Sequence, residues 1–164
     1  PGPIPNPAFG TDPDAPEFLK PGDYPRLVQA YCRRTGQPVP ESVGQVVRCA
    51  LESLALKYRQ TFEQLESILG RRLEPVHIVG GGSRNRLLNQ FTADALGRRV
   101  VAGPVEATAI GNILVQAAAL GELDWPAGAR AVVRASFDVV EFLPGDAVPW
   151  AEAYRRARTV RSDE

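Results

Sequence analysis

Three consecutive glycines, Gly80-Gly81-Gly82, lie where the backbone could bind a ligand directly. Residues 75–79 before them are short, apolar and β-branched, which predicts a buried strand. A helix reaching to about residue 95 should follow, capped by Ser83 or Asn85. Glycines let a ligand approach the backbone closely, and a helix start offers unpaired N–H groups and a positive dipole end. The turn would lie at the carboxyl edge of the sheet, where ligands bind in open α/β sheets, so we expect a nucleotide or another flat, polar or anionic ligand.

The spacing alone leaves alternatives to this interpretation. A P-loop is excluded, because no Gly-Lys-Ser/Thr follows the glycines. A dinucleotide fingerprint fits imperfectly, since Asn85 replaces its third glycine, although Glu106 is placed to bind a ribose hydroxyl in that scheme. A plain tight turn before a capped helix is the alternative without a ligand.

The side chains that usually carry out catalysis are sparse. His77 is the only histidine and lies in the apolar strand, which favours a core or edge residue bonded to backbone over a catalytic base. Glu52 and Glu106 have no evident partner, and no second histidine or acidic cluster offers metal ligands. Arg84 and Arg86 flank the glycines, where a solvated surface position is favoured over a phosphate contact. We therefore predict neither a catalytic residue nor a metal-binding residue in this chain.

Helices and short strands are expected to alternate along the chain. A helix over 24–34 precedes the longest helix, which starts after a capping box at Ser42 and Gln45 and ends at Gly70. Its predicted buried stripe is Val46, Ala50, Leu54, Tyr58, Phe62, Leu65 and Leu69. Further on we expect strands at 99–102 and 139–143, and helices at 106–120, 127–134 and 151–158, the first of these rich in small residues that permit close packing. The order predicts an α/β fold with parallel strand pairing.

Composition narrows the class of protein. The chain has 164 residues with nineteen acidic and nineteen basic side chains, so no overall field favours nucleic acid or anionic lipid as a partner. No apolar run approaches the ~20 residues that span a bilayer. Cys32 and Cys49 suit buried thiols in a reducing cytoplasm.

Residues 1–25 are rich in proline. Proline disfavours both helices and central strands, so we expect an extended segment that leads into the first helix. The alternative is a polyproline ligand for an SH3-like partner. The chain contains no methionine and opens on proline. Removal of an initiator methionine or excision from a longer protein would each explain that start.

Three blocks of sequence resemble the rhamnulokinase branch of the FGGY carbohydrate kinases. They are residues 35–58, with Thr-Gly-Gln-Pro-Val-Pro-Glu-Ser at their start, residues 77–85, and residues 101–112. The resemblance covers roughly 18–142. It implies part of an RNase H-like lobe of the actin, hexokinase and Hsp70 ATPase superfamily, organised as a lead-in (1–25), a partial nucleotide-side kinase domain (26–145) and a terminal helix with a charged tail (146–164).

The resemblance also implies a reaction, in which ATP phosphorylates the ketose L-rhamnulose to L-rhamnulose 1-phosphate with Mg²⁺ accompanying the nucleotide. It assigns the nucleotide wall to Gly80, Gly81, Gly82, Ser83 and Asn85. The block at 103–112 is expected to pack beneath that site. The family's phosphate loop, catalytic aspartate and sugar-binding residues precede these blocks, so the chain alone is expected to be inactive without an amino-terminal lobe. A non-catalytic nucleotide-binding module and an inactive remnant are the alternatives.

Overall fold

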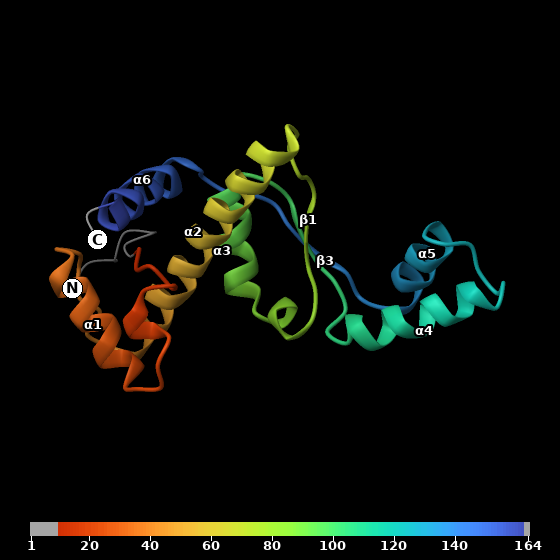
Figure 1. Cartoon of the computed structure of the whole chain (residues 1–164), viewed down its shortest axis with the longest axis horizontal. Helices are drawn as coiled ribbons and strands as arrows, with labels where there is room; N and C mark the ends of the chain where they lie inside the picture. Colours follow the sequence, from red (N-terminus) through yellow and green to blue (C-terminus); the bar gives the residue numbers. More distant parts are fainter. Residues whose placement is uncertain (1–9, 163–164) are drawn as a thin grey trace.

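The helix α2 (Val43–Leu69) is the scaffold on which the other large helices pack. Ser42 and Gln45 form the predicted capping box, and Gly70 ends the helix in the left-handed conformation at φ 64°. The computed structural model describes residues 10–162. In it α1 (Tyr24–Arg34), α3 (Arg86–Leu96) and α6 (Val148–Ser162) gather around α2 (Figure 1). Residues from α2, α3 and α6 form the main apolar cluster, centred on Leu56, Phe91 and Trp150.

The predicted buried stripe of α2 is wrong. Of its residues, Ala50, Tyr58, Leu65 and Leu69 are exposed, and the other members are half-buried. The buried face consists of Cys49, Glu52, Ser53, Ala55 and Leu56. The helix carries apolar residues on more than one side, and α1, α3 and α6 cover only one of them. Glu52 lies on the covered side with its carboxylate 2.7 Å from Nε of Arg48.

A three-stranded sheet lies beside α3, with the order β1 (Val76–Ile78), β2 (Val100–Ala102) and β3 (Val140–Phe142). The β1–β2 pairing is parallel, as predicted, and β2–β3 is antiparallel. Side chains on one face pack against Ala93 and Leu96 of α3. β1 is therefore an edge strand, and the predicted burial is confirmed only for the face that carries Val76, because His77 and Val79 are exposed.

The helices α4 (Ala107–Ala119) and α5 (Ala127–Ser136) form a hairpin that extends away from the bundle (Figure 1). Each packs mainly on the other, and each buries only one residue, Leu114 and Ala129. The close packing predicted for the small residues of α4 is not seen at Gly111, where an added Cβ would meet nothing within 4 Å. Within residues 10–162, no helix combines the length and apolar character needed to cross a membrane.

Residues 10–25 pack against the helices. The backbone N–H of Thr11 donates to Oγ of Ser53 over 3.0 Å, and a short 3₁₀ helix spans Pro16–Phe18. The residues before Gly10 lie outside the described part of the chain. Cys32 and Cys49 are free and fully buried between α1 and α2, which confirms the predicted buried thiols. A hydrogen bond with Cys49 lowers the pKa of Cys32, while that bond and burial raise the pKa of Cys49.

Candidate functional site

The glycine turn follows β1 directly, and its first residue needs to be glycine. Gly80 has φ 78° and ψ −164°, a region that is essentially restricted to glycine. Its N–H donates to the carbonyl of Pro104 over 3.1 Å, which ties the turn to the segment after β2. Ser83 closes the turn, because its hydroxyl donates to the carbonyl of Gly80 over 2.7 Å. A 3₁₀ helix over Gly81–Arg84 then leads into α3.

Asn85 is the N-cap of α3, as predicted. Its Oδ1 accepts the N–H of Leu88 over 3.0 Å, so the side chain is held at the positive end of the helix. The side-chain oxygen of Asn85 is therefore already hydrogen-bonded, whereas the side-chain nitrogen of Asn85 has no hydrogen bond within residues 10–162. Asn85 can therefore offer N–H donors to a ligand.

Asn89 supports the turn from inside the protein and was missed by the sequence reasoning. Its side chain is fully buried and donates from Nδ2 to the carbonyl of Ser83 over 2.9 Å. Its Oδ1 has no hydrogen-bond partner in the described part of the chain. An asparagine four residues after the N-cap was the available signal, because an amide on the buried side of a helix must find polar partners.

The structure brings the five predicted site residues together on one short turn. Gly81, Gly82 and Asn85 are exposed and Ser83 is half-buried. A Cβ built at Gly81 would meet no atom within 4 Å, and one at Gly82 would meet only Ile78 at 3.9 Å. The turn thus leaves the backbone of Gly81 and Gly82 open to approach. Arg86 is exposed, and its guanidinium lies over the ring of Phe142, 5.6 Å from its centre.

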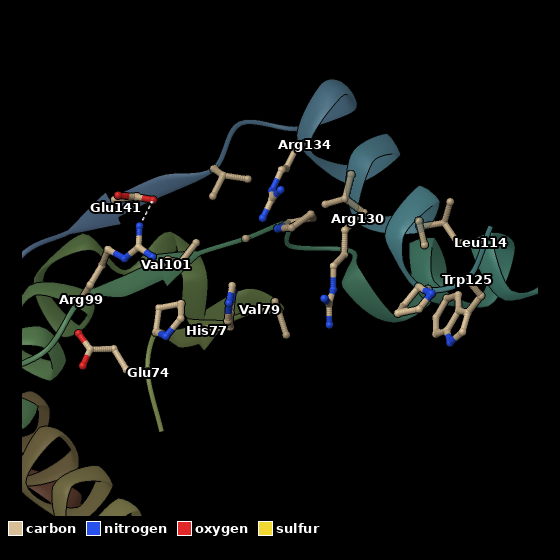
Figure 2. Close-up of a pocket in the computed structure, with 18 residues that line it drawn as sticks. Glu74, His77, Val79, Arg99, Val101, Leu114, Trp125, Arg130, Arg134 and Glu141 are labelled. Atoms are coloured by element: carbon tan, nitrogen blue, oxygen red, sulfur yellow. Dashed lines mark hydrogen bonds and ion pairs between the residues drawn. The ribbon is translucent and has the colours of Figure 1, made fainter. Parts of the chain in front are cut away.

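A hollow of about 910 Å³ lies beside this turn, between the open face of the sheet and the α4–α5 hairpin. Figure 2 shows Arg130 and Arg134 extending from α5 into this space, with His77 and Val79 of the β1 segment on the other side. The glycine turn itself is not part of the lining. His77 is exposed here, so the expectation of a histidine bonded to backbone is not met among the described contacts. The two arginines were missed, although their four-residue spacing places them on one side of a helix.

Residues 10–162 contain no group of three or more histidine, cysteine or acidic side chains placed to hold a metal ion. Glu106 is exposed just before α4, and His77 and Glu52 lie on β1 and α2. The chemistry that this turn supports is therefore binding through backbone N–H groups and the Asn85 amide.

This chain is similar to carbohydrate kinases in sequence and in fold. Residues 4–120 match the C-terminal domain of the FGGY family of carbohydrate kinases. A rhamnulokinase from Bacteroides thetaiotaomicron is 51% identical over 87% of this chain and 30% of its own length. A rhamnulokinase from Halalkalibacterium halodurans is 43% identical over 82% of the chain and 29% of its own length. Among solved structures, a xylulose kinase from Rhodospirillum rubrum is similar with a TM-score of 0.62 at 23% identity, over 78% of this chain and 26% of that one.

Proposed function

Because the chain belongs to the FGGY family of carbohydrate kinases, we propose that it forms the nucleotide-binding, carboxy-terminal part of an enzyme that phosphorylates L-rhamnulose with ATP. The observation that carries this proposal is the 51% identity to a rhamnulokinase across most of the chain, including the glycine turn. The chain spans less than a third of the curated relatives it matches. The similarity to the xylulose kinase supports the fold alone, and it agrees with the predicted α/β class with parallel pairing.

In this proposal the turn forms one wall of the nucleotide site. Gly81 and Gly82 let the nucleotide lie against the backbone, because no Cβ stands between them and solvent. The Asn85 amide donates to the adenine or ribose side, while Gly80 and Ser83 fix the shape of the turn. The supporting evidence is the geometry of the turn and the helix start behind it.

Mg²⁺ enters this scheme with the nucleotide. No metal-holding cluster is present among residues 10–162, so the ion does not fit a site formed by these side chains alone. When bound to ATP it neutralises phosphate charge, and the remainder of the enzyme supplies its protein ligands, the base and the sugar pocket. We place the enzyme in the cytoplasm, where free buried thiols such as Cys32 and Cys49 are stable.

A chimera tests the function. The part of the Bacteroides thetaiotaomicron rhamnulokinase that lies outside the match is joined to this chain in place of its own matched part. We expect ATP-dependent formation of L-rhamnulose 1-phosphate by the chimera and none by the chain alone. Turnover by the chain alone would contradict the assignment of catalysis to the missing part. An inactive chimera that still binds ATP would favour a non-catalytic nucleotide-binding module.

A further inference from the structure

Asn89 of α3 ties the glycine turn to the interior of the protein. Its side chain is fully buried, and its Nδ2 donates to the carbonyl of Ser83 over 2.9 Å. That carbonyl belongs to the 3₁₀ helix over Gly81–Arg84, and no backbone N–H within residues 10–162 donates to it. The bond from Asn89 therefore fixes the end of the turn against a longer helix.

The Ser83 carbonyl sets the direction of this short helix. In a helix the carbonyls point toward the C-terminal end, and the N–H groups point toward the N-terminal end, where the first of them lack partners within the helix. Those first N–H groups belong here to Gly81 and Gly82, and neither donates to a backbone carbonyl within residues 10–162. A bond that fixes the carbonyl of Ser83 therefore also fixes where these two N–H groups point. They are the donors that the proposed nucleotide wall offers to a ligand.

The buried amide of Asn89 is costly for the fold. Its Oδ1 has no hydrogen-bond partner in the described part of the chain, and a buried acceptor without a partner destabilises a protein. Thr92, one turn further along α3 and equally buried, has no such cost, because its hydroxyl donates to the carbonyl of Leu88 over 2.7 Å. Stability alone would favour an apolar side chain at position 89. The bond to Ser83 is what the amide adds, and this bond acts on the shape of the turn.

We propose that Asn89 is a positioning residue of the nucleotide site. It is fully buried and does not touch the nucleotide. It acts by holding the Ser83 carbonyl, so that the N–H groups of Gly81 and Gly82 are oriented before ATP binds. Donors that are already oriented bind more tightly, because less ordering is needed when the ligand arrives. This inference rests on the proposed function, since it takes the glycine turn to bind the nucleotide.

Amide hydrogen exchange in the isolated chain tests the link between Asn89 and the turn. Asn89→Leu removes the donor and keeps a side chain of similar volume. The N–H groups of Ser83 and Asn85 form hydrogen bonds within the turn, and we expect them to exchange at least about 10-fold faster in this variant, because the turn opens more easily. The N–H of Gly103, which is bonded across the sheet, should keep its rate. Unchanged rates in the turn, or equal acceleration at Gly103, would overturn the proposal.

Kinetics of the chimera described above test the consequence for ATP. In Asn89→Leu we expect the KM for ATP to rise about 3- to 10-fold, the range for loss of one hydrogen bond, while kcat changes by less than about twofold. Asn89→Asp has nearly the same shape but no donor at neutral pH, and its KM for ATP should rise at least as much. Thr92→Val is the matched control, because it removes an equally buried hydroxyl whose bond stays within α3. A normal KM for ATP in both Asn89 variants, or the same rise in Thr92→Val, would overturn the proposal.

Calorimetric ATP titration of the same chimeras keeps this inference apart from the proposed function. An active chimera whose Asn89 variants bind ATP normally would overturn the inference and leave the function standing. An inactive chimera whose ATP affinity falls in Asn89→Leu but not in Thr92→Val would do the reverse. A chimera that binds no ATP would overturn both.

Discussion

Gly80 and Gly81 are neighbours in one turn, yet a methyl group would affect them differently. Gly80 has a backbone conformation that side chains rarely adopt, with the carbonyl of Val105 3.9 Å from an added Cβ. Gly81 has no positive φ and open space around it. The first glycine is thus required by the fold, and the second is available for ligand binding.

The expected result of Gly80→Ala is a loss of about 1–3 kcal/mol in the free energy of unfolding, because the strained conformation remains. Gly81→Ala should change that free energy by no more than about 0.5 kcal/mol. Its effect should instead be a weaker ATP affinity, because the added methyl group stands where the nucleotide meets the backbone. Urea unfolding followed by circular dichroism and calorimetric ATP titration measure the two quantities. Normal ATP affinity in Gly81→Ala would remove this residue from the proposed wall.

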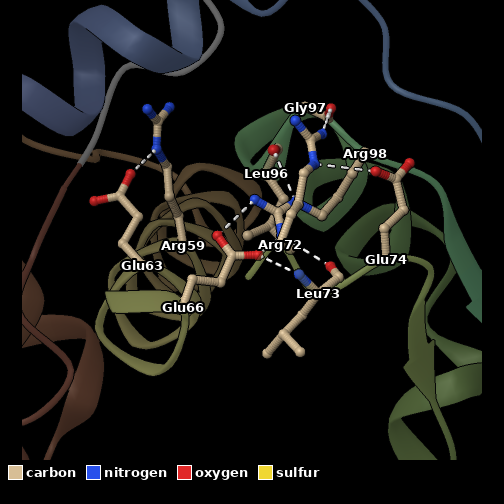
Figure 3. Close-up of polar contacts among 9 residues, drawn as sticks. All are labelled: Arg59, Glu63, Glu66, Arg72, Leu73, Glu74, Leu96, Gly97 and Arg98. Carbon is tan, nitrogen blue, oxygen red and sulfur yellow. Dashed lines mark hydrogen bonds and ion pairs between the residues drawn. The ribbon is translucent and has the colours of Figure 1, made fainter. Parts of the chain in front are cut away.

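An ion pair between Glu66 and Arg98 joins the last turn of α2 to the loop before β2. The carboxylate of Glu66 accepts from the guanidinium of Arg98 and, over 2.6 Å, from the N–H of Leu73 (Figure 3). Arg98 also donates to the carbonyl of Leu73 over 2.8 Å. The hydrogen bond from Arg98, with that from Leu73, lowers the pKa of Glu66 from 4.5 to about 2. Arg72 adds a further positive charge nearby.

This lowered pKa predicts how stability changes with acid. A carboxyl group whose pKa is lower in the folded protein stabilises it fully above the unfolded value, and that stabilisation is lost as pH falls toward the folded value. We expect the Glu66 contribution to fade between about pH 4.5 and pH 2. Glu66→Gln should unfold with a shallower pH dependence in this range, measured as Tm against pH. A parallel decline in both proteins would mean that other groups control acid unfolding. Glu122→Gln is the control, because this exposed carboxylate forms no ion pair within residues 10–162.

At the scale of elements, α6 joins the bundle through an aromatic contact. Trp150 is 2% exposed, and its ring centre lies 5.2 Å from that of Phe91 on α3. Tyr154 donates its hydroxyl to the carboxylate of Glu63 on α2 over 2.7 Å. Burial and this hydrogen bond raise the pKa of Tyr154 to about 12. The terminal helix is thus part of the core.

Substitution of the two tryptophans tests this role. Trp150→Ala should cost about 3–5 kcal/mol in the free energy of unfolding, the range for removal of a large aromatic side chain from a core. Trp125→Ala is the control, because Trp125 is 59% exposed in the segment just before α5. We expect the control to stay within about 0.5 kcal/mol of the original chain in urea unfolding. Similar losses in both variants would contradict the assignment of α6 to the core.

Local signals predicted most element positions, because they act over a few residues. The Ser42–Gln45 box and the Asn85 cap mark helix starts whatever the rest of the fold does. The stripe on α2 and the full burial of β1 were wrong for the opposite reason. Periodicity shows which residues are apolar but not which side a neighbour covers, and this depends on contacts distant in sequence. At the site, the glycine turn was recognisable, whereas Asn89 and the α5 arginines gained meaning only from their surroundings.

At the scale of the whole molecule, two parts differ in how well they are packed. In the bundle, α2, α3 and α6 form one buried apolar cluster, and α1 and α2 form another. The α4–α5 hairpin rests mainly on itself and leaves Ile113, Leu120 and Val132 exposed. A ten-residue helix such as α5 is marginal without tertiary contacts. Local opening should therefore require less free energy in the hairpin than in the bundle.

Limited digestion with trypsin should reveal this difference, because cleavage needs a locally unfolded segment. In the isolated chain we expect cleavage after Arg130 and Arg134, both exposed on α5, before cleavage after Lys57 and Arg59 on α2. Mass spectrometry of the first fragments identifies the cut sites. If α2 were cut as early as α5 in the isolated chain, the bundle would not be the more stable part.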